Sequence, residues 1–387
     1  MALDEQASMV RELVAKFVSR ELIPLEPEVL RRQARGEAGL SGEEIHRLRD
    51  ISKGLGLWGL DAPKEMGGMD LPVTTMLAVA EELAKTIVPF SFPPDSPNLR
   101  MMQAVASPAQ KAKYLQPYIE GTMTSAMAIS EPGAGGDPAA MKTRAVREAD
   151  HWVLNGRKVW ISNARHADFT IVMARVGEGE RQQGVTAFIV EKGTPGFIIE
   201  REIPMLGAVN TCEILFADCR VPQDGVLGEI GQGYAPMQLR LQTRRLQMGA
   251  TALGFTERAL NMLAEYARQR ITFGVPLSER QAIQWWVADT TIQMYACRLM
   301  LQDAAAKVDQ GHDARQEISI IKVHATEMAY AAVDHAMQTL GALGMTRETP
   351  LYWMWHRARL ARIYEGPSEV HRQTIARRVL GKPQAIR

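Results

Sequence analysis

The sequence has few cysteines, no long apolar run and almost no net charge. Its 387 residues include three cysteines, Cys212, Cys219 and Cys297, in no metal-binding spacing, so we expect no disulfide framework, no metal site and a reducing, cytoplasmic setting. The absence of about 18 consecutive apolar residues argues against a membrane span. Residues 1–10 carry acidic side chains and no apolar signal core, which argues against secretion. Basic and acidic side chains number 45 and 44, so nothing indicates nucleic-acid binding.

The length and composition are those of a globular protein with two to three domains. At about 150 residues per domain, the chain is long enough for that number. Apolar residues make up 46% and charged residues 23%, and the 31 glycines and 20 prolines are close to average, which excludes collagen-like and disordered chains. The pattern changes along the chain and predicts a helical domain over 1–120, a β domain over 121–228 and a helical domain over 229–387.

The first stretch has the apolar spacing of helices. Apolar side chains recur at helical intervals over residues 4–20, which predicts a helix there. Ser41 and Glu44 have the spacing of a capping box before a further apolar face. Proline-rich breaks, such as residues 92–97, separate the helical pieces.

The middle stretch has short apolar runs punctuated by turn residues. Asn155-Gly156 lies between two such runs and predicts a β-hairpin turn. Further strands are expected over 169–174, 185–190, 197–200 and 212–216. These strands predict a β-barrel or sandwich of about 100 residues.

The last stretch returns to long helical patterns. Residues 239–270, 279–308 and 314–343 each have helical periodicity over about 30 residues, or 45 Å. With a shorter helix near 368–380 they predict a four-helix bundle. The expected fold class is therefore α+β and mainly α, with a β-barrel or sandwich between two helical domains.

Two motifs of the middle stretch are candidates for holding a ligand. Residues 129–137 form a glycine-rich turn that lets backbone amides approach a ligand closely, although an ordinary surface turn has the same composition. Trp160 followed by Ser162 can flank a planar ring and donate a hydrogen bond to it. The alternative is a tryptophan in the core of the β domain.

Two motifs of the last stretch carry further candidates. Arg270 and Thr272 lie where one long helix ends and the next begins, an arrangement that suits a pyrophosphate but also an ordinary solvated turn. Glu365 precedes Gly-Pro at an irregular joint between two helical stretches. A carboxylate at such a joint can point into a cleft as a general base, or it can simply be an exposed residue at a helix end.

Taken together and in this order, the motifs resemble the acyl-CoA dehydrogenase family of flavoproteins over nearly the whole chain. The matching segments are Ser130-Glu-Pro-Gly-Ala-Gly-Gly-Asp137, Trp160-Ile-Ser-Asn163, Arg270-Ile-Thr-Phe-Gly274 with Gln281, Gln338-Thr-Leu-Gly-Ala-Leu-Gly344 and Tyr364-Glu-Gly-Pro367. The resemblance implies FAD between the β domain and the C-terminal bundle. It also implies a homo-oligomer, because cofactor sites shared between subunits make such proteins dimers or, most often, tetramers.

The resemblance also implies which residues hold the cofactor. Those expected to meet the flavin ring are Ile129, Ser130, Trp160 and Ser162. Those expected to hold the pyrophosphate and adenine from a neighbouring subunit are Arg270, Thr272, Phe273, Gln281, Gln338 and Gly341.

The reaction that the resemblance implies is α,β-desaturation of an acyl-CoA thioester to the trans-2-enoyl-CoA. Glu365 would take the α-proton while the β-hydrogen leaves as a hydride to flavin N5. The residues expected to contact the substrate are Gly136, Arg245, Glu365 and Gly366. Some relatives carry the base just before the arginine that Arg245 matches; here that position is Arg244, which cannot act as a base, so Glu365 is the candidate.

Some residues depart from the family pattern, and two other functions remain open. Gly136 replaces the usual Ser and Pro367 the usual Thr, which changes contacts expected with CoA and FAD. Four tryptophans could narrow an acyl pocket or lie in the core: Trp285, Trp286, Trp353 and Trp355. Electron-transfer flavoprotein is the expected electron acceptor. The alternatives are an acyl-CoA oxidase that uses O₂ and a non-catalytic acyl-CoA-binding flavoprotein.

Overall fold

The computed structural model describes residues 5–177, 184–206 and 210–381, which form two compact units. Unit 1 comprises residues 1–61, 71–92 and 244–387, and unit 2 comprises residues 62–70 and 93–243. Asp4, with which the predicted first helix begins, and the chain ends at residues 1 and 387 lie outside the described residues. The domain limits at residues 120 and 228 stay a prediction.

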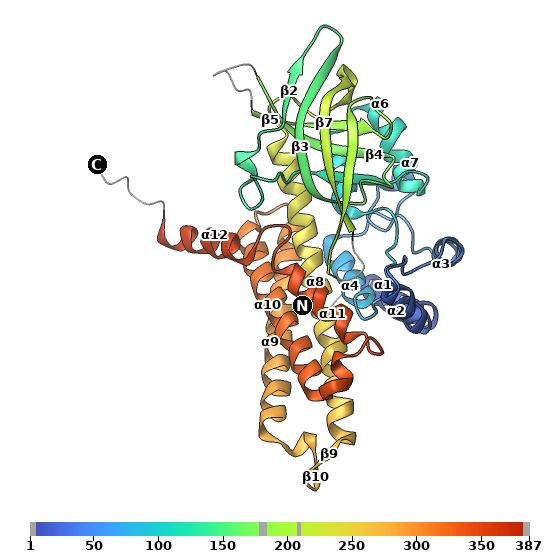
Figure 1. Cartoon of the computed structure of the whole chain (residues 1–387), viewed down its shortest axis with the longest axis vertical. Helices are drawn as coiled ribbons and strands as arrows, with labels where there is room; N and C mark the ends of the chain where they lie inside the picture. The colour runs from blue at the N-terminus through green and yellow to red at the C-terminus, as the bar shows by residue number, and fades with distance from the viewer. Residues whose placement is uncertain (1–4, 178–183, 207–209, 382–387) are drawn as a thin grey trace. The chain divides into compact units, whose positions relative to one another are not determined.

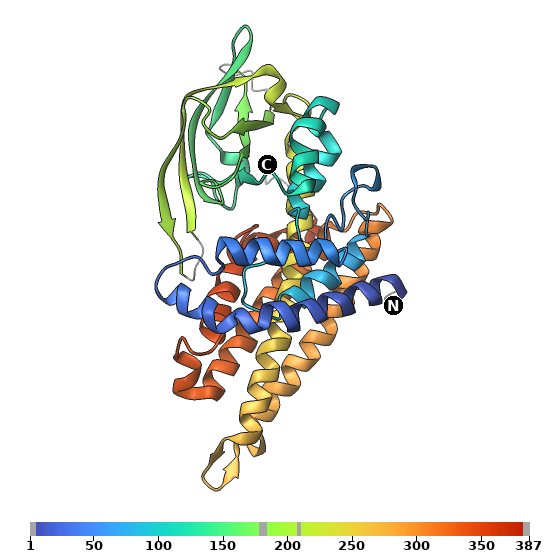
Figure 2. The same ribbon diagram turned by 90° about the vertical axis from the view of Figure 1, so that its right-hand side faces the viewer.

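Unit 1 is helical. Its helices are α1 (Glu5–Phe17), α2 (Glu26–Ala34), α3 (Gly42–Gly54), α4 (Val73–Leu83), α9 (Gln281–Asp309), α10 (Arg315–Leu340), α11 (Leu351–Ala361), α12 (Ser368–Leu380) and the part of α8 (Tyr234–Gln269) from Arg244 onward. Helix α1 packs against α4, and α4 packs against α9 (Figure 2). The capping box of α3 is confirmed, because Ser41 Oγ accepts a 3.2 Å bond from Glu44 N–H and Glu44 Oε2 accepts a 2.7 Å bond from Ser41 N–H.

The long helices predicted for the C-terminal bundle are confirmed. They are α8 with 36 residues, α9 with 29 and α10 with 26, and α12 follows near the chain end. Helices α8 and α9 run side by side to a two-stranded hairpin of β9 (Ile271–Thr272) and β10 (Val275–Pro276), which forms the tip of unit 1 (Figure 1). Helix α11 was not predicted from the sequence.

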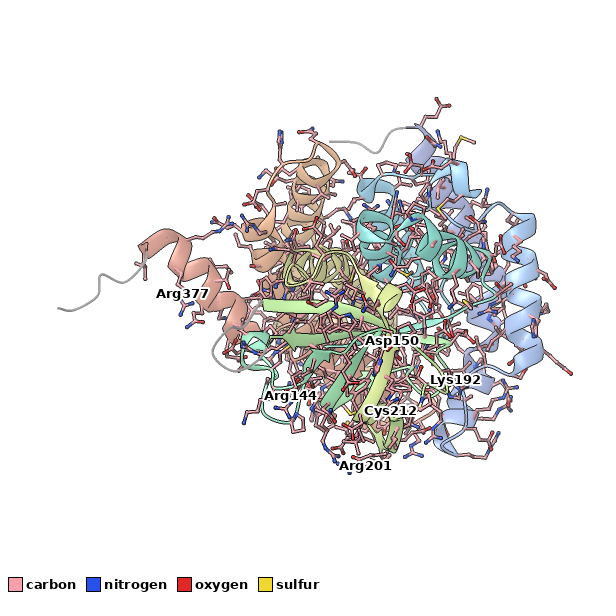
Figure 3. The ribbon with its side chains drawn as sticks, turned by 90° about the horizontal axis from the view of Figure 1, so that it is seen from above. Arg144, Asp150, Lys192, Arg201, Cys212 and Arg377 are labelled. Carbon is pink, nitrogen blue, oxygen red and sulfur yellow. The ribbon has the colours of Figure 1, made fainter. Side chains whose placement is uncertain are left out.

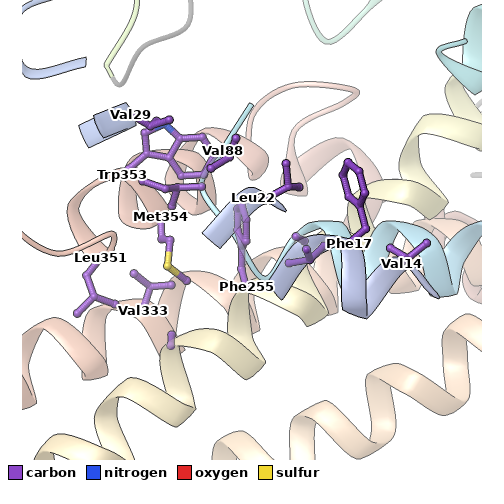
Figure 4. Packing of buried hydrophobic residues seen from close by; sticks show 14 of the residues in the cluster. Val14, Phe17, Leu22, Val29, Val88, Phe255, Val333, Leu351, Trp353 and Met354 are labelled. Carbon is purple, nitrogen blue, oxygen red and sulfur yellow. The ribbon is translucent and has the colours of Figure 1, made fainter. Parts of the chain in front are cut away.

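The core of unit 1 contains one of the four tryptophans that were considered for an acyl pocket. Trp353 is 7% exposed and packs edge-on against Phe255, with ring centroids 5.8 Å apart (Figure 4). Trp286 and Trp355 pack partly buried against the same cluster, whereas Trp285 is 59% exposed. The core interpretation is therefore right for Trp353, and Trp285 belongs to the surface.

Unit 2 contains an eight-stranded sheet and three short helices. The helices are α5 (Ser96–Val105), α6 (Pro108–Gln110) and α7 (Gln116–Glu120). The strands are β1 (Ser125–Ala128), β2 (Arg144–Arg147), β3 (His151–Ser162), β4 (Phe169–Val176), β5 (Gly184–Glu191), β6 (Phe197–Pro204), β7 (Asn210–Pro222) and β8 (Val226–Leu227). Their order is β6-β7-β3-β2-β4-β5-β8, and β1 pairs in parallel with β4. Arg201 and Cys212, labelled in Figure 3, lie on the paired strands β6 and β7.

The hairpin turn predicted at Asn155-Gly156 is wrong, because β3 runs through both residues. The pairing of β3 with β7 shifts register between Leu154 and Gly156, so the dipeptide forms a bulge. Gly156 has φ 151°, and a Cβ there would lie 2.5 Å from Thr143 Oγ1, so the position requires glycine. Asn155 Oδ1 accepts a 2.9 Å bond from Asp218 N–H on the neighbouring strand. The Asn-Gly pair thus serves a close strand contact instead of a turn.

Within the described ranges, no helix is long and apolar enough to cross a membrane. The same residues include no group of three His, Cys, Asp or Glu side chains that could hold a metal ion. All three cysteines are buried and free.

Candidate active site

Glu365 lies in the irregular segment between α11 and α12, as the sequence predicts. The residue is half-buried, which is not the position of an exposed side chain at a helix end. Its φ is 56° and that of Gly366 is 96°, so both residues are in the left-handed region. A glutamate in this region is strained, and such strain persists where the surroundings fix the backbone. A Cβ at Gly366 would lie 2.9 Å from His371 Nε2, so only glycine fits there.

Three side chains from three helices fix the backbone next to Glu365. Arg245 Nε of α8 donates to Glu365 O at 2.8 Å, and Lys322 Nζ of α10 donates to Gly366 O at 2.7 Å. His371 Nε2 of α12 lies 3.3 Å from Glu365 O; since a carbonyl only accepts, this nitrogen carries the proton. The resemblance predicts Arg245 as a substrate contact. In the structure its side chain, from α8, binds the segment that carries the candidate base.

Lys322 and His371 were not predicted from the sequence. Lys322 is fully buried, and His371 is 2% exposed. A signal for Lys322 was available, because it occupies a position on α10 where helical spacing otherwise places apolar residues: Ile318 and Ala325 are both buried. Burial lowers the pKa of Lys322 to about 8, and the charge of Arg245 adds to this effect whereas Glu365 opposes it. Burial, with the nearby Arg245 charge, also lowers the pKa of His371 to about 4.

Burial of His371 predicts that the protein loses stability in mild acid. Between the unfolded pKa near 6.5 and the native pKa of about 4, the unfolded chain binds a proton that the native state does not, so the free energy of unfolding falls as the pH falls. The full loss is about 3 kcal/mol. Urea unfolding of wild type and His371→Gln at pH 7 and pH 5 measures the part of this loss that occurs above pH 5, about 2 kcal/mol.

The His371→Gln variant keeps a side-chain donor but does not titrate, so its free energy of unfolding should change less over this interval. The exposed His46 of α3 provides the control, and His46→Gln should show the pH dependence of the wild type. Equal pH dependence in all three proteins would rule out His371 as the cause.

The four residues predicted to meet the flavin ring lie together in unit 2. Lys158 Nζ donates to Ile129 O at 2.9 Å, and the Val159 N–H donates to Ser130 O at 2.9 Å, so residues 129–130 run along β3. Trp160 and Ser162 follow on β3 at a bulge, where Trp160 has φ 63°, and both are exposed on either side of the buried Ile161. Trp160 is 54% exposed, which rules out the core interpretation. An exposed indole beside a hydroxyl gives this part of β3 the flat apolar surface and hydrogen-bonding group that a flavin ring requires.

A buried ion pair holds the glycine-rich turn against β3. Glu131 is 6% exposed, and its Oε1 accepts a 2.9 Å bond from Lys158 Nζ, while its two oxygens also accept the backbone N–H groups of Lys142 and Thr143. Burial lowers the pKa of Lys158 to about 8, although Glu131 favours its charged form. Burial alone would raise the pKa of Glu131, but Lys158 and the hydrogen bonds outweigh it and the pKa is lowered. The ion pair of Glu131 and Lys158 was not predicted from the sequence. Gly136, a predicted substrate contact further along the same turn, is exposed.

The residues predicted to hold the pyrophosphate lie at the tip of unit 1. Phe273 is 98% exposed and has φ 51°, at the turn between β9 and β10. Arg280 donates to Thr272 O at 2.7 Å, and Arg270 O accepts a 2.8 Å bond from Leu277 N–H, so the turn is well ordered. Gln281, the first residue of α9, is exposed. Arg270 and Phe273 are exposed on this hydrogen-bonded turn, so they are accessible to a ligand or to another subunit.

The length of α8 separates this tip from Glu365. Arg245, which contacts Glu365 O, is 24 residues before Gln269 at the end of α8. At 1.5 Å per residue these residues are about 36 Å apart. The structure therefore does not bring the tip and the candidate base of one chain together. Gln338 and Gly341 form another exposed group, at the end of α10.

Comparisons with known proteins place the chain among flavoproteins that act on acyl-CoA thioesters. Family models described as the acyl-CoA dehydrogenase N-terminal, middle and C-terminal domains match residues 4–122, 126–219 and 231–380. The (R)-benzylsuccinyl-CoA dehydrogenase of Thauera aromatica is 38% identical, over 98% of this chain and 96% of that protein. The solved butyryl-CoA dehydrogenase of Megasphaera elsdenii is 30% identical with a TM-score of 0.86, covering 98% of this chain and 99% of that one. PigA, solved with FAD and proline, is 27% identical with a TM-score of 0.87, covering 98% of each chain.

Proposed function

Because this chain belongs to the acyl-CoA dehydrogenase family, we propose that it is an FAD-dependent enzyme that converts an acyl-CoA to the trans-2-enoyl-CoA with Glu365 as the base. The observation that carries the assignment of the base is the strained, half-buried position of Glu365, whose carbonyl oxygen binds Arg245. Backbone strain of this kind gathers at active sites. FAD, when bound, accepts the hydride that leaves the β-carbon.

In the proposed reaction this chain moves a proton and stabilises a charge. Glu365 takes the α-proton on its carboxylate. The enolate oxygen that develops needs hydrogen-bond donors, and we assign its protein donor to the backbone N–H of Glu365. Trp160 and Ser162 would cover and orient the flavin ring, and Ile129 and Ser130 would border it. Gly366, which has no side chain, would leave room for the substrate beside Arg245. Gly136 is a further proposed substrate contact.

The experiment that tests the proposed function follows the colour of the purified protein. We expect a yellow protein whose bound flavin bleaches on addition of a suitable acyl-CoA without oxygen. In air, steady turnover should require electron-transfer flavoprotein or a dye, because bound product keeps water and oxygen from the reduced flavin. A peroxide-forming rate equal to the dye rate would instead identify an acyl-CoA oxidase. Bleaching by no acyl-CoA would leave a non-catalytic binding protein.

A panel of acyl-CoA compounds tests the substrate, and we propose that the acyl chain carries a free carboxylate in addition to the thioester. Arg244 is half-buried on the same turn of α8 as Arg245, and its guanidinium donates to Gln247 Oε1 at 3.1 Å. The guanidinium of Arg244, the neighbour of Arg245 on α8, would attract a carboxylate on the acyl chain. The name of the Thauera relative describes a substrate of this type. Benzylsuccinyl-CoA should therefore bleach the flavin faster than butyryl-CoA, and the reverse order would contradict this proposal.

The exposed apolar residues of unit 1 support a homo-oligomer, which we propose to be a tetramer. One side of α9 carries Trp285, Ile292, Tyr295 and Leu299, all at least 45% exposed. Their spacing of seven, three and four residues places them on one helix face. An apolar patch of this kind is typical of a subunit contact, and native mass spectrometry measures the oligomeric state.

The buried free cysteines favour the reducing, cytoplasmic setting proposed for this enzyme.

Arg270 should hold the pyrophosphate of FAD bound mainly by a neighbouring subunit. Arg270→Ala removes a charge-assisted hydrogen bond worth about 1.5–3 kcal/mol, so we expect weak FAD retention and a less stable oligomer. Flavin absorbance per subunit after gel filtration measures the first effect, and thermal unfolding measures the second. Arg268→Ala removes another exposed arginine from the last turn of α8 and serves as the control. Full FAD occupancy with unchanged thermal stability in Arg270→Ala would place Arg270 outside the site.

A further inference from the structure

A fully buried lysine, Lys322, donates a hydrogen bond to the backbone that follows Glu365. Two consecutive carbonyl oxygens, those of Glu365 and Gly366, face side chains that carry or can carry positive charge. Arg245 and His371 share the first oxygen, and Lys322 binds the second at 2.7 Å. Because residues 365 and 366 both have positive φ, the two peptide groups need such partners to keep their orientation.

Burial of Lys322 costs folding free energy, and the packing around it does not require a lysine. Its side chain is fully buried, and the charged form of a lysine loses hydration when it is buried. Its neighbours on the same side of α10 are apolar or small, among them Ile318 and Ala325, so an apolar residue would be ordinary at this position. Gly366 O is a neutral acceptor, so its hydrogen bond with Lys322 compensates only part of the hydration that the ammonium group loses. A buried lysine that the packing does not require points to a role in the site.

The charged groups around Lys322 lie on three helices and on the segment that carries Glu365. Arg245 on α8 opposes its charged form, and Glu365, Glu327 of α10 and Glu369 of α12 favour it. His371 of α12 is buried beside the same carbonyl groups and is neutral near pH 7, since its pKa is about 4. Lys322 therefore lies among charges from three helices and the base segment, and its ammonium group binds the backbone that follows Glu365.

We propose that Lys322 is a positioning residue for Glu365: its ammonium group holds the peptide after Gly366, and with it the backbone of the base, in place. This inference rests on the proposed function, because it assumes that Glu365 takes the α-proton. Loss of the ammonium group would let residues 365–366 relax. The rate would then fall more than substrate affinity, since no contact with acyl-CoA is removed.

The test compares Lys322→Met with Lys322→Arg. In Lys322→Met we expect kcat to fall at least ~10-fold and KM to change less than about threefold. Lys322→Arg keeps a charged donor at this position, so its kcat should lie between those of wild type and Lys322→Met. Ile318→Ala makes a cavity in the same helix and should keep kcat within about threefold of wild type.

Hydrogen exchange gives a readout that needs no turnover. The amides of residues 362–367 should exchange at least ~10-fold faster in Lys322→Met than in Ile318→Ala. Wild-type kcat and wild-type exchange in Lys322→Met would overturn the proposal. Failure of both Lys322 variants to fold with flavin bound would also overturn it and leave Lys322 a structural residue. A wild-type protein that no acyl-CoA reduces would instead reject the proposed function.

Discussion

Replacing Glu365 by glutamine should lower the rate of flavin reduction by acyl-CoA at least ~10²-fold, with FAD still bound. The glutamine side chain has nearly the same shape but accepts no proton at neutral pH. The carbonyl contacts from Arg245, Lys322 and His371 involve the backbone and survive the change. The loss should therefore appear in the chemical step and not in binding. Stopped-flow flavin absorbance without oxygen measures the rate, and titration with acyl-CoA measures binding.

Glu369→Gln provides the matched control for this result. Glu369 lies four residues away in the first turn of α12 and is exposed. Its replacement changes the same charge near the site but removes no proposed base, so the rate should stay within about threefold of wild type. If Glu365→Gln kept activity within tenfold of wild type, the base would have to be another residue.

Replacing Glu131 by glutamine should destabilise the protein by about 3–5 kcal/mol, because it leaves the buried Lys158 without its counter-charge. The bond between Lys158 and Glu131 is 2.9 Å long and links the glycine-rich turn to β3 just before Trp160. The turn and the face that carries Trp160 should loosen together, and FAD retention should fall with stability. Urea unfolding measures the first effect and flavin absorbance the second.

Two variants show whether burial causes this effect. Glu191→Gln breaks a carboxylate–lysine pair with Lys113 in the same unit, but both side chains are about half exposed, at 48% and 59%, so the loss should stay below about 1 kcal/mol. The double variant Glu131→Gln/Lys158→Met removes both buried charges and should recover part of the stability. A loss in Glu131→Gln no larger than in Glu191→Gln would contradict the prediction.

Local patterns in the sequence predicted the elements and the places where they end. The capping box at Ser41, the long helices of the bundle and the irregular joint at Glu365 depend on residues a few positions apart, which periodicity and turn chemistry report. The Asn155-Gly156 prediction failed because the dipeptide fits a bulge as well as a turn. Contact with Asp218, 63 residues away, decides between them.

The parts of the site that escaped prediction depend on distant partners. Lys158 is 27 residues from Glu131, and Lys322 is 44 residues from Gly366. Nothing local marks either lysine as buried, apart from the apolar spacing around Lys322 on α10. Trp160 shows the same limit, because its position on β3 does not reveal whether it faces the core or solvent.

The length of α8 has a genetic consequence. The base segment and the Arg270 tip are about 36 Å apart along this helix, so under the proposed sharing each cofactor site takes its base from one subunit and its tip from another. Consider subunits with Glu365→Gln co-expressed with subunits that carry Arg270→Ala. In a mixed pair, one site has both defects and the other has neither. The two defective subunits should therefore complement each other, which two defects in a site built within one chain could not do.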